Sequence, residues 1–283
     1  MLLTNTQEVA LVVIFSVLFV GGLLTVIVYG VLVCNFSSNK HGLNTILLIS
    51  VFYQTVYSVF GIIHAVYSLF AIVADFEPNG DVMFWTAMPL YSLRMVLPVS
   101  SLFVALDRLV ATRFPVIYRS TIFGKLSITA GLATASVAII NVAVYIWKRE
   151  ISDASPFTFS RYMEPMVVYA LSDVHNGLVF CTSSNINTTN LMVFYQLLAE
   201  FVVKVIPSFA TSIARYAYQV NWPQHIGPYV IAIQVIYTAI CSITYTWKMR
   251  VYKSVRTNSV VLIGSNNGVK YISVHRISIN TYM

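Results

Sequence analysis

The side chains of Asp107 and Arg108 stand next to each other at the end of a long apolar stretch, and Pro115 and Tyr118 follow shortly after. A carboxylate beside a guanidinium can form an ion pair. Charges at this depth are costly unless they are paired or reach the lipid headgroups, as Arg can. Two interpretations are open: the pair marks only the end of a membrane span, or it is a two-state ion pair that serves as a switch.

Four further polar residues lie inside apolar stretches, where such residues are candidates for function: Arg94, Glu200, Lys204 and His64. Arg94 precedes Arg108 by 14 residues, which is about 21 Å along a helix. It can pair with an acidic ligand or with a structural partner such as Glu200. Glu200 and Lys204 are four residues apart and can neutralise each other. A lone His such as His64 is more often a packing residue than a ligand.

Membrane-spanning helices must position these residues. The 283-residue chain is 58% hydrophobic and only 10% charged, with a mean hydropathy of +0.76, whereas soluble domains carry about 25% charged residues. Apolar stretches of roughly 18 residues or more indicate membrane helices. Such stretches occur at 9–33, 43–74, 82–106, 126–147, 191–214 and 226–247.

The apolar stretches favour helices over a β-barrel because they lack the alternating pattern of barrel strands. A helix also satisfies all its backbone hydrogen bonds within one segment, as lipid requires. The first stretch has no Lys or Arg before it and is too long for a signal peptide. The sequence therefore predicts an all-α membrane protein, with a helix bundle over 1–256 and a loosely ordered tail at 257–283.

The distribution of charge predicts the orientation of the bundle. The 75–81 connection has three acidic residues and no basic one, whereas 107–125 has four basic residues and the chain after 247 has six. Because Lys and Arg are enriched on the cytoplasmic side, we expect the N-terminus outside and the tail inside. The 148–190 segment is then a long extracellular loop, and Asn187 in it is a glycosylation candidate. This orientation accounts for the net charge of +7 without nucleic acid.

The pattern Asp107-Arg108-x-x-Ala111-x-x-x-Pro115-x-x-Tyr118 resembles the signature that closes the third helix of rhodopsin-like G-protein-coupled receptors. The resemblance implies that Asp107 holds Arg108 in the resting state and that Arg108 turns toward the G protein on activation. It also implies that the segment with Pro115 and Tyr118 contacts the G protein. The stretch 243–256, which interleaves apolar and basic residues, looks like the end of the family's last helix turning into a short interfacial helix.

Other positions depart from the family pattern. Leu109 replaces the usual Tyr, Gln54 replaces an ion-binding Asp, Gly21-Gly22 replaces Gly-Asn, and Met83 stands near the place of a disulfide Cys. Such losses around a retained motif resemble the nematode serpentine chemoreceptors, with class BC as the subclass to compare.

The number of spans raises a difficulty. Six spans with the N-terminus outside would leave the basic tail outside, and a further helix at 163–181 would bury three ionisable residues. Either the tail breaks the positive-inside rule, or the chain lacks a helix that its relatives have. We favour the second interpretation, in which 226–247 is the family's last helix and the sixth is missing between Arg215 and His225.

The resemblance implies a plasma-membrane receptor that binds a small molecule from outside and signals to a heterotrimeric G protein. Arg94 would lie in the outer half, where the family binds ligands. We expect no catalytic chemistry, cofactor or metal, because the sequence has no metal-ligand spacing, phosphate loop or nucleophile elbow. Two rivals remain: a transporter or channel that uses Arg94, Glu200 and Lys204 as a polar pathway, and a truncated receptor that does not signal.

Overall fold

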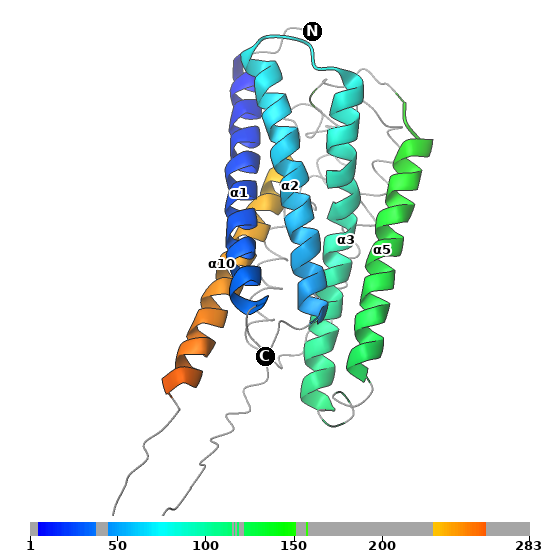
Figure 1. The fold of residues 1–283 in the computed structure, drawn as a ribbon. Helices are drawn as coiled ribbons and strands as arrows, with labels where there is room; N and C mark the ends of the chain where they lie inside the picture. The colour runs from blue at the N-terminus through cyan, green and yellow to red at the C-terminus, as the bar shows by residue number, and fades with distance from the viewer. Residues whose placement is uncertain are drawn as a thin grey trace, which may run out of the picture.

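The computed structural model describes residues 5–37, 45–114, 116, 118, 122–150, 157 and 229–258. Five long helices make up most of these residues (Figure 1): α1 (Asn5–Ser37), α2 (Thr45–Val73), α3 (Gly80–Arg113), α5 (Phe123–Trp147) and α10 (Tyr229–Asn258). All five are long and apolar enough to cross a bilayer. The chain is therefore a multi-pass α-helical membrane protein, which confirms that part of the prediction.

Five of the six predicted spans coincide with these helices, which extend a few residues beyond most of the predicted ends. The span predicted at 191–214 lies outside the described residues, as does nearly all of 148–190 and the tail after Asn258. The short interfacial helix expected near 243–256 is not a separate element. Instead, α10 continues as one helix to Asn258.

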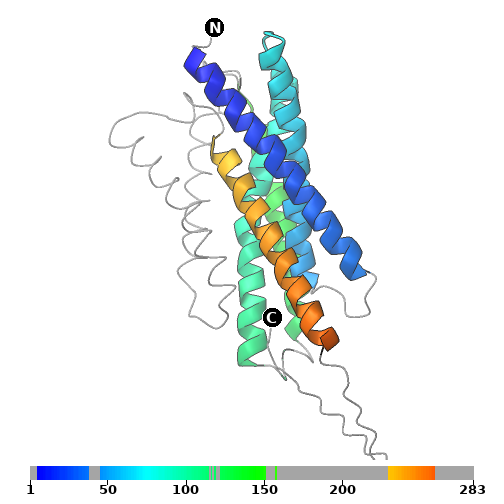
Figure 2. The ribbon, with the colours of Figure 1, turned by 90° about the vertical axis from the view of Figure 1, so that its left-hand side faces the viewer.

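The five described helices run in two opposite directions. Ser50 of α2 lies beside Ser100 of α3, and His64 lies beside Thr86, so these two helices are antiparallel. In Figures 1 and 2, α1, α3 and α10 run in one direction, and α2 and α5 run in the other. α10 packs along α1, and α5 packs along α3.

The bundle has two ends of opposite charge. We call the end with Asp75, Glu77 and Asp81 the acidic end, and the end with Arg108 and Lys125 the basic end. Because α10 runs parallel to α1, its last residues point to the basic end (Figure 1). The sidedness of the tail stays a prediction. The residues between α5 and α10 that bear on the number of spans lie outside the described part, apart from 148–150 and 157.

Two adjacent glycines hold α1 between two helices. A Cβ on Gly21 would lie 2.7 Å from Cγ1 of Val235 in α10. A Cβ on Gly22 would lie 2.8 Å from Cγ1 of Ile62 and 3.1 Å from the carbonyl oxygen of Ser58, both in α2. The missing side chains let α1 approach both neighbours closely, as small residues do at membrane helix contacts.

Apolar side chains fill the centre of the bundle and also cover its outside. The largest core cluster joins α1, α2, α3, α5 and α10 through residues such as Phe15, Leu18, Tyr57, Leu90 and Val235. Exposed apolar residues lie along every helix, and α5 is the least buried of the five spans. An outer surface of this kind matches a lipid environment rather than water.

We expect tags at the two ends of the chain to lie on opposite sides of the membrane, with the C-terminal tag in the cytosol. The physical reason is the direction of α10 together with the basic residues at its end. Protease protection of tagged protein in intact cells measures this. Exposure of both tags on the same side would contradict the parallel arrangement of α1 and α10.

We expect Gly22→Ala to destabilise the bundle by about 1–3 kcal/mol, because the added methyl must push Ile62 and the α2 backbone away. Gly30→Ala in the same helix is the matched control, since a Cβ there meets nothing within 4 Å. The control is expected to be neutral or slightly stabilising. Thermal unfolding of the purified variants in one detergent compares them, and equal melting temperatures would argue against the close α1–α2 contact.

Candidate functional site

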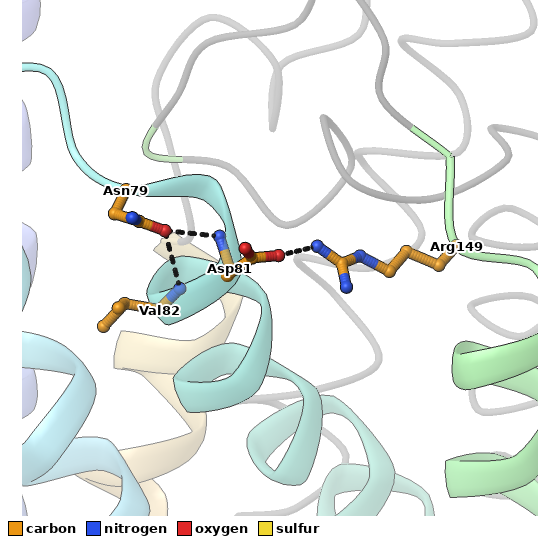
Figure 3. Close-up of polar contacts among 4 residues, drawn as sticks. All are labelled: Asn79, Asp81, Val82 and Arg149. Atoms are coloured by element: carbon orange, nitrogen blue, oxygen red, sulfur yellow. Dashed lines mark hydrogen bonds and ion pairs between the residues drawn. The ribbon is translucent and has the colours of Figure 1, made fainter.

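The longest of the described helices, α3, carries three of the predicted site residues, Arg94, Asp107 and Arg108, and its start is fixed at the acidic end. The Asn79 side-chain oxygen accepts hydrogen bonds from the backbone N–H of Asp81 (2.9 Å) and of Val82 (3.4 Å), as Figure 3 shows. This is an N-cap, which satisfies donors that the first turn of a helix leaves free. The Asn79 N–H itself donates to the hydroxyl of Tyr67 in α2 at 2.8 Å.

An ion pair joins the start of α3 to the end of α5. The Arg149 guanidinium donates to the Asp81 carboxylate (Figure 3) and lies 4.8 Å from the centre of the Phe84 ring. Both charged side chains are substantially exposed, so solvent screening leaves the pair worth little energy. Its effect is positional, because it links α3 and α5 where the chain leaves the bundle. No property of the sequence separated Arg149 from other loop residues in advance.

At the basic end, the structure brings Asp107, Arg108 and Tyr118 together. Asp107 is 1% exposed, although it lies near the end of the helix. Its Oδ2 is 3.6 Å from Nε of Arg108, and its Oδ1 accepts a hydrogen bond from the Tyr118 hydroxyl. Pro115 lies outside the described residues. The predicted ion pair is therefore present, together with a third partner that spacing alone did not reveal.

The contact between Asp107 and Arg108 is loose for a reason of helix geometry. Adjacent residues point about 100° apart around a helix and do not face each other. The backbone N–H of Tyr118 donates to the Phe114 carbonyl at 2.9 Å, and the Tyr118 ring packs edge-on against Phe123. This backbone hydrogen bond closes one turn after α3, and from it the Tyr118 hydroxyl reaches the buried Asp107 carboxylate.

A chain of polar side chains connects α1, α2 and α3 inside the bundle. The Tyr29 hydroxyl donates to Oε1 of Gln54, and Nε2 of Gln54 donates to Oγ of Ser50 at 3.4 Å. Oγ of Ser50 lies 3.4 Å from Oγ of Ser100. All four residues are buried. The partners of Gln54 depend on how the helices are rotated, which the sequence does not specify.

Arg94 is a buried cation at the middle of α3, with 8% of its surface exposed. Its positive charge acts on the hydroxyl groups of Tyr57 in α2, Tyr91 in α3 and Tyr145 in α5. Side chains in a helix lean toward its N-terminus, so the guanidinium extends toward the acidic end. Pro98, one turn later in α3, has no N–H to donate to the Arg94 carbonyl.

The other predicted pocket residues do not join Arg94 in the described structure. His64 is buried, with Nδ1 3.0 Å from the Thr86 hydroxyl and its ring edge-on to Phe15, which indicates a packing role. Glu200, Lys204 and Asn187 lie outside the described residues. Within the described ranges, no group of three or more His, Cys, Asp or Glu side chains could hold a metal ion.

Comparison with known proteins adds no identification. The sequence matches no family model and no curated protein. Interpretation of the site therefore depends on the chemistry of α3 and its neighbours.

We expect Tyr29→Phe and Gln54→Met each to lower the melting temperature, and their effects to be non-additive. Gln54→Met leaves the buried Tyr29 hydroxyl without its acceptor, whereas the double variant removes both partners. The expected coupling is about 0.5–1.5 kcal/mol, in the range of interhelical hydrogen bonds in membranes.

Thr55→Val is the matched control for this cycle. The Thr55 hydroxyl donates only within its own helix, to the Val51 carbonyl at 2.8 Å. Its effect is expected to add to that of Tyr29→Phe. If the effects of Gln54→Met and Tyr29→Phe on the melting temperature also add, the contact between these two side chains contributes no stability.

Proposed function

We propose that this protein is a plasma-membrane receptor of the rhodopsin-like, G-protein-coupled type, which binds a small molecule from outside and activates a heterotrimeric G protein inside. The observation that carries this proposal is the buried Asp107 at the basic end, held by Arg108 on one side and by Tyr118 on the other. An element with two stable arrangements is what a switch requires. The N-terminus is outside, and the basic end faces the cytosol.

In the resting state, Arg108 pairs with the Asp107 carboxylate and the Tyr118 hydroxyl donates a hydrogen bond to it. A hydrogen bond to a charged group contributes about 1.5–3 kcal/mol, so loss of the Tyr118 contact is enough to shift a two-state equilibrium about tenfold or more. When the ion pair with Asp107 breaks, the Arg108 guanidinium can turn away from the helix. Its guanidinium then offers a rigid, planar set of donors to carbonyl or carboxylate groups of the G protein.

The structure of α3 supplies a mechanical link between a ligand and this switch. Arg94 and Asp107 belong to one continuous helix, and Pro98 lies between them. Pro98 removes one backbone hydrogen bond of α3, and the Ser100 hydroxyl donates to the Leu97 carbonyl at 2.9 Å in the same turn. Such features bend helices and provide hinges. Movement at Arg94 is thereby transmitted to the basic end as a change of angle.

A transporter or channel with Arg94 in a polar pathway is the second candidate, favoured by the buried chain from Tyr29 to Ser100. The transporter function and the receptor function differ in what they predict for the basic end. In a transporter, Arg108 has no role in the movement of solute.

We expect Asp107→Asn and Tyr118→Phe to raise ligand-independent nucleotide exchange several-fold, because each weakens the resting contact. Arg108→Ala is expected to abolish exchange, including the exchange caused by Asp107→Asn. The measurement is nucleotide exchange on purified heterotrimeric G proteins with the receptor in lipid vesicles. Because the subtype is not defined by the sequence, one member of each main class of Gα is used.

Arg113→Ala is the control, since Arg113 is exposed at the same end of α3. It is expected to behave like the original chain. If Asp107→Asn and Tyr118→Phe leave exchange at the background level with every Gα, the receptor function is wrong. If ion or solute flux into the same vesicles depends on Arg94 instead, the transporter function replaces it.

A further inference from the structure

Arg94 is a buried charge that forms no ion pair with another described residue. The ion pairs within the described part of the chain are Arg108–Asp107 and Arg149–Asp81, and neither includes Arg94. Arg94 is more than nine-tenths buried in a span that crosses the bilayer. A buried guanidinium without a counter-charge is unfavourable. Among the described residues, Arg94 therefore forms a cationic site that an anion can complete.

Three tyrosines, one each from α2, α3 and α5, lie within electrostatic reach of this charge. The charge of Arg94 interacts with the hydroxyl groups of Tyr57, Tyr91 and Tyr145. Tyr57 and Tyr145 are buried. The Tyr57 hydroxyl lies 3.5 Å from the Ile231 carbonyl oxygen of α10, at the long limit of a hydrogen bond, so it can be redirected to a stronger acceptor. The site thus offers a planar cation together with phenolic donors.

A fourth helix contributes an unsatisfied donor. Gln234 of α10 is 2% exposed, and within the described structure its side-chain Nε2 has no hydrogen-bond partner. It lies one turn after Ile231, whose carbonyl faces Tyr57. A buried amide nitrogen without an acceptor costs free energy. The bundle thus buries an unsatisfied amide donor on α10 as well as the Arg94 guanidinium on α3.

Apolar side chains of α3 and α10 pack together with two of these tyrosines. Leu90, Leu93 and Leu97 of α3 and Ile231 and Val235 of α10 belong to the same core cluster as Tyr57 and Tyr145. A ligand that fits such a place needs an apolar body and one polar head. The single positive charge suits a monoanion, and the forked guanidinium suits the two oxygens of a carboxylate. An amine would meet like charge.

We propose that Arg94 is the anchor of a binding site for an apolar monocarboxylate, in which Tyr57, Tyr91 and Tyr145 supply hydroxyl groups to the carboxylate and the apolar residues of α3 and α10 contact its body. The inference names the ligand class of the proposed receptor and rests on that function for access from the outer side. The side chain of Arg94 leans toward that side. Binding itself can be measured without any G protein.

The test uses the purified full-length chain and a series of probes that share one body: hexanoate, hexanol and hexylamine, and phenylacetate with its methyl ester. We expect the two carboxylates to raise the melting temperature in proportion to log concentration, because they bind the folded state. The alcohol, amine and ester are expected to have little effect. Arg94→Gln should weaken binding of the acids roughly tenfold or more, and Arg94→Lys should weaken it less.

The stability of Arg94→Gln without any probe separates the proposal from its structural rival, in which Glu200 neutralises Arg94. If the site awaits a ligand, removal of the unpaired charge raises the melting temperature or leaves it unchanged, as is common for functional residues. If Arg94 and Glu200 are paired, Arg94→Gln lowers it, and Glu200→Gln in the same chain restores it. That second pattern overturns the proposal, and so does failure of both acids to stabilise the original chain at millimolar concentrations.

Two further variants keep binding and signalling apart. Arg149→Gln removes an arginine at the acidic end and is expected to bind the acids normally, so the effect is specific to Arg94. Arg108→Ala is expected to bind them normally while nucleotide exchange is lost. Binding with no exchange by any variant contradicts the receptor function but leaves the carboxylate site intact. If Asp107→Asn alters nucleotide exchange but the carboxylates do not bind, the receptor function stands and the carboxylate site is wrong.

Discussion

A charge placed inside a bilayer has to be neutralised by something within reach, and this requirement organises the described bundle around α3. Among the described residues, the charged side chains that are buried are Arg94 and Asp107, and both belong to that helix. Asp107 is held by its own helix and by Tyr118, whereas the charge of Arg94 acts on tyrosines of neighbouring helices. The positions of α2 and α5 therefore depend on the interaction of Arg94 with their tyrosines as well as on apolar packing.

The sequence predicted the spans well because lipid imposes a simple rule on length and composition. It predicted less about the faces of the helices. In α1, apolar side chains lie on every side, so periodicity does not indicate which side meets α2 or α10. The Tyr29–Gln54 and Ser50–Ser100 contacts depend on that rotation and on depth in the bundle, and only the three-dimensional arrangement provides both.

The motif at the end of α3 was visible from spacing, but its partners were only partly visible. Asp107 and Arg108 are neighbours in sequence, so their proximity was certain. The Tyr118 hydroxyl reaches Asp107 from a turn that the backbone hydrogen bond between Tyr118 and Phe114 closes, and no pattern of residue types specifies that turn. The pair Gly21-Gly22 was visible as a departure from a family pattern. Its role in bringing α1 against two helices became clear from the contacts of each Cβ position.

The glycine pair also has a consequence for biosynthesis. It holds α1 between α2, which is made next, and α10, which is the last described helix. At about 5–20 residues per second, a ribosome completes α10 roughly 10–45 s after α1. During that interval the Gly21 face of α1 is covered by lipid or by the insertion machinery instead of Val235. Closure of the bundle is therefore the final step of its assembly, and a chain interrupted before α10 presents an open groove that a separately made copy of that helix could fill.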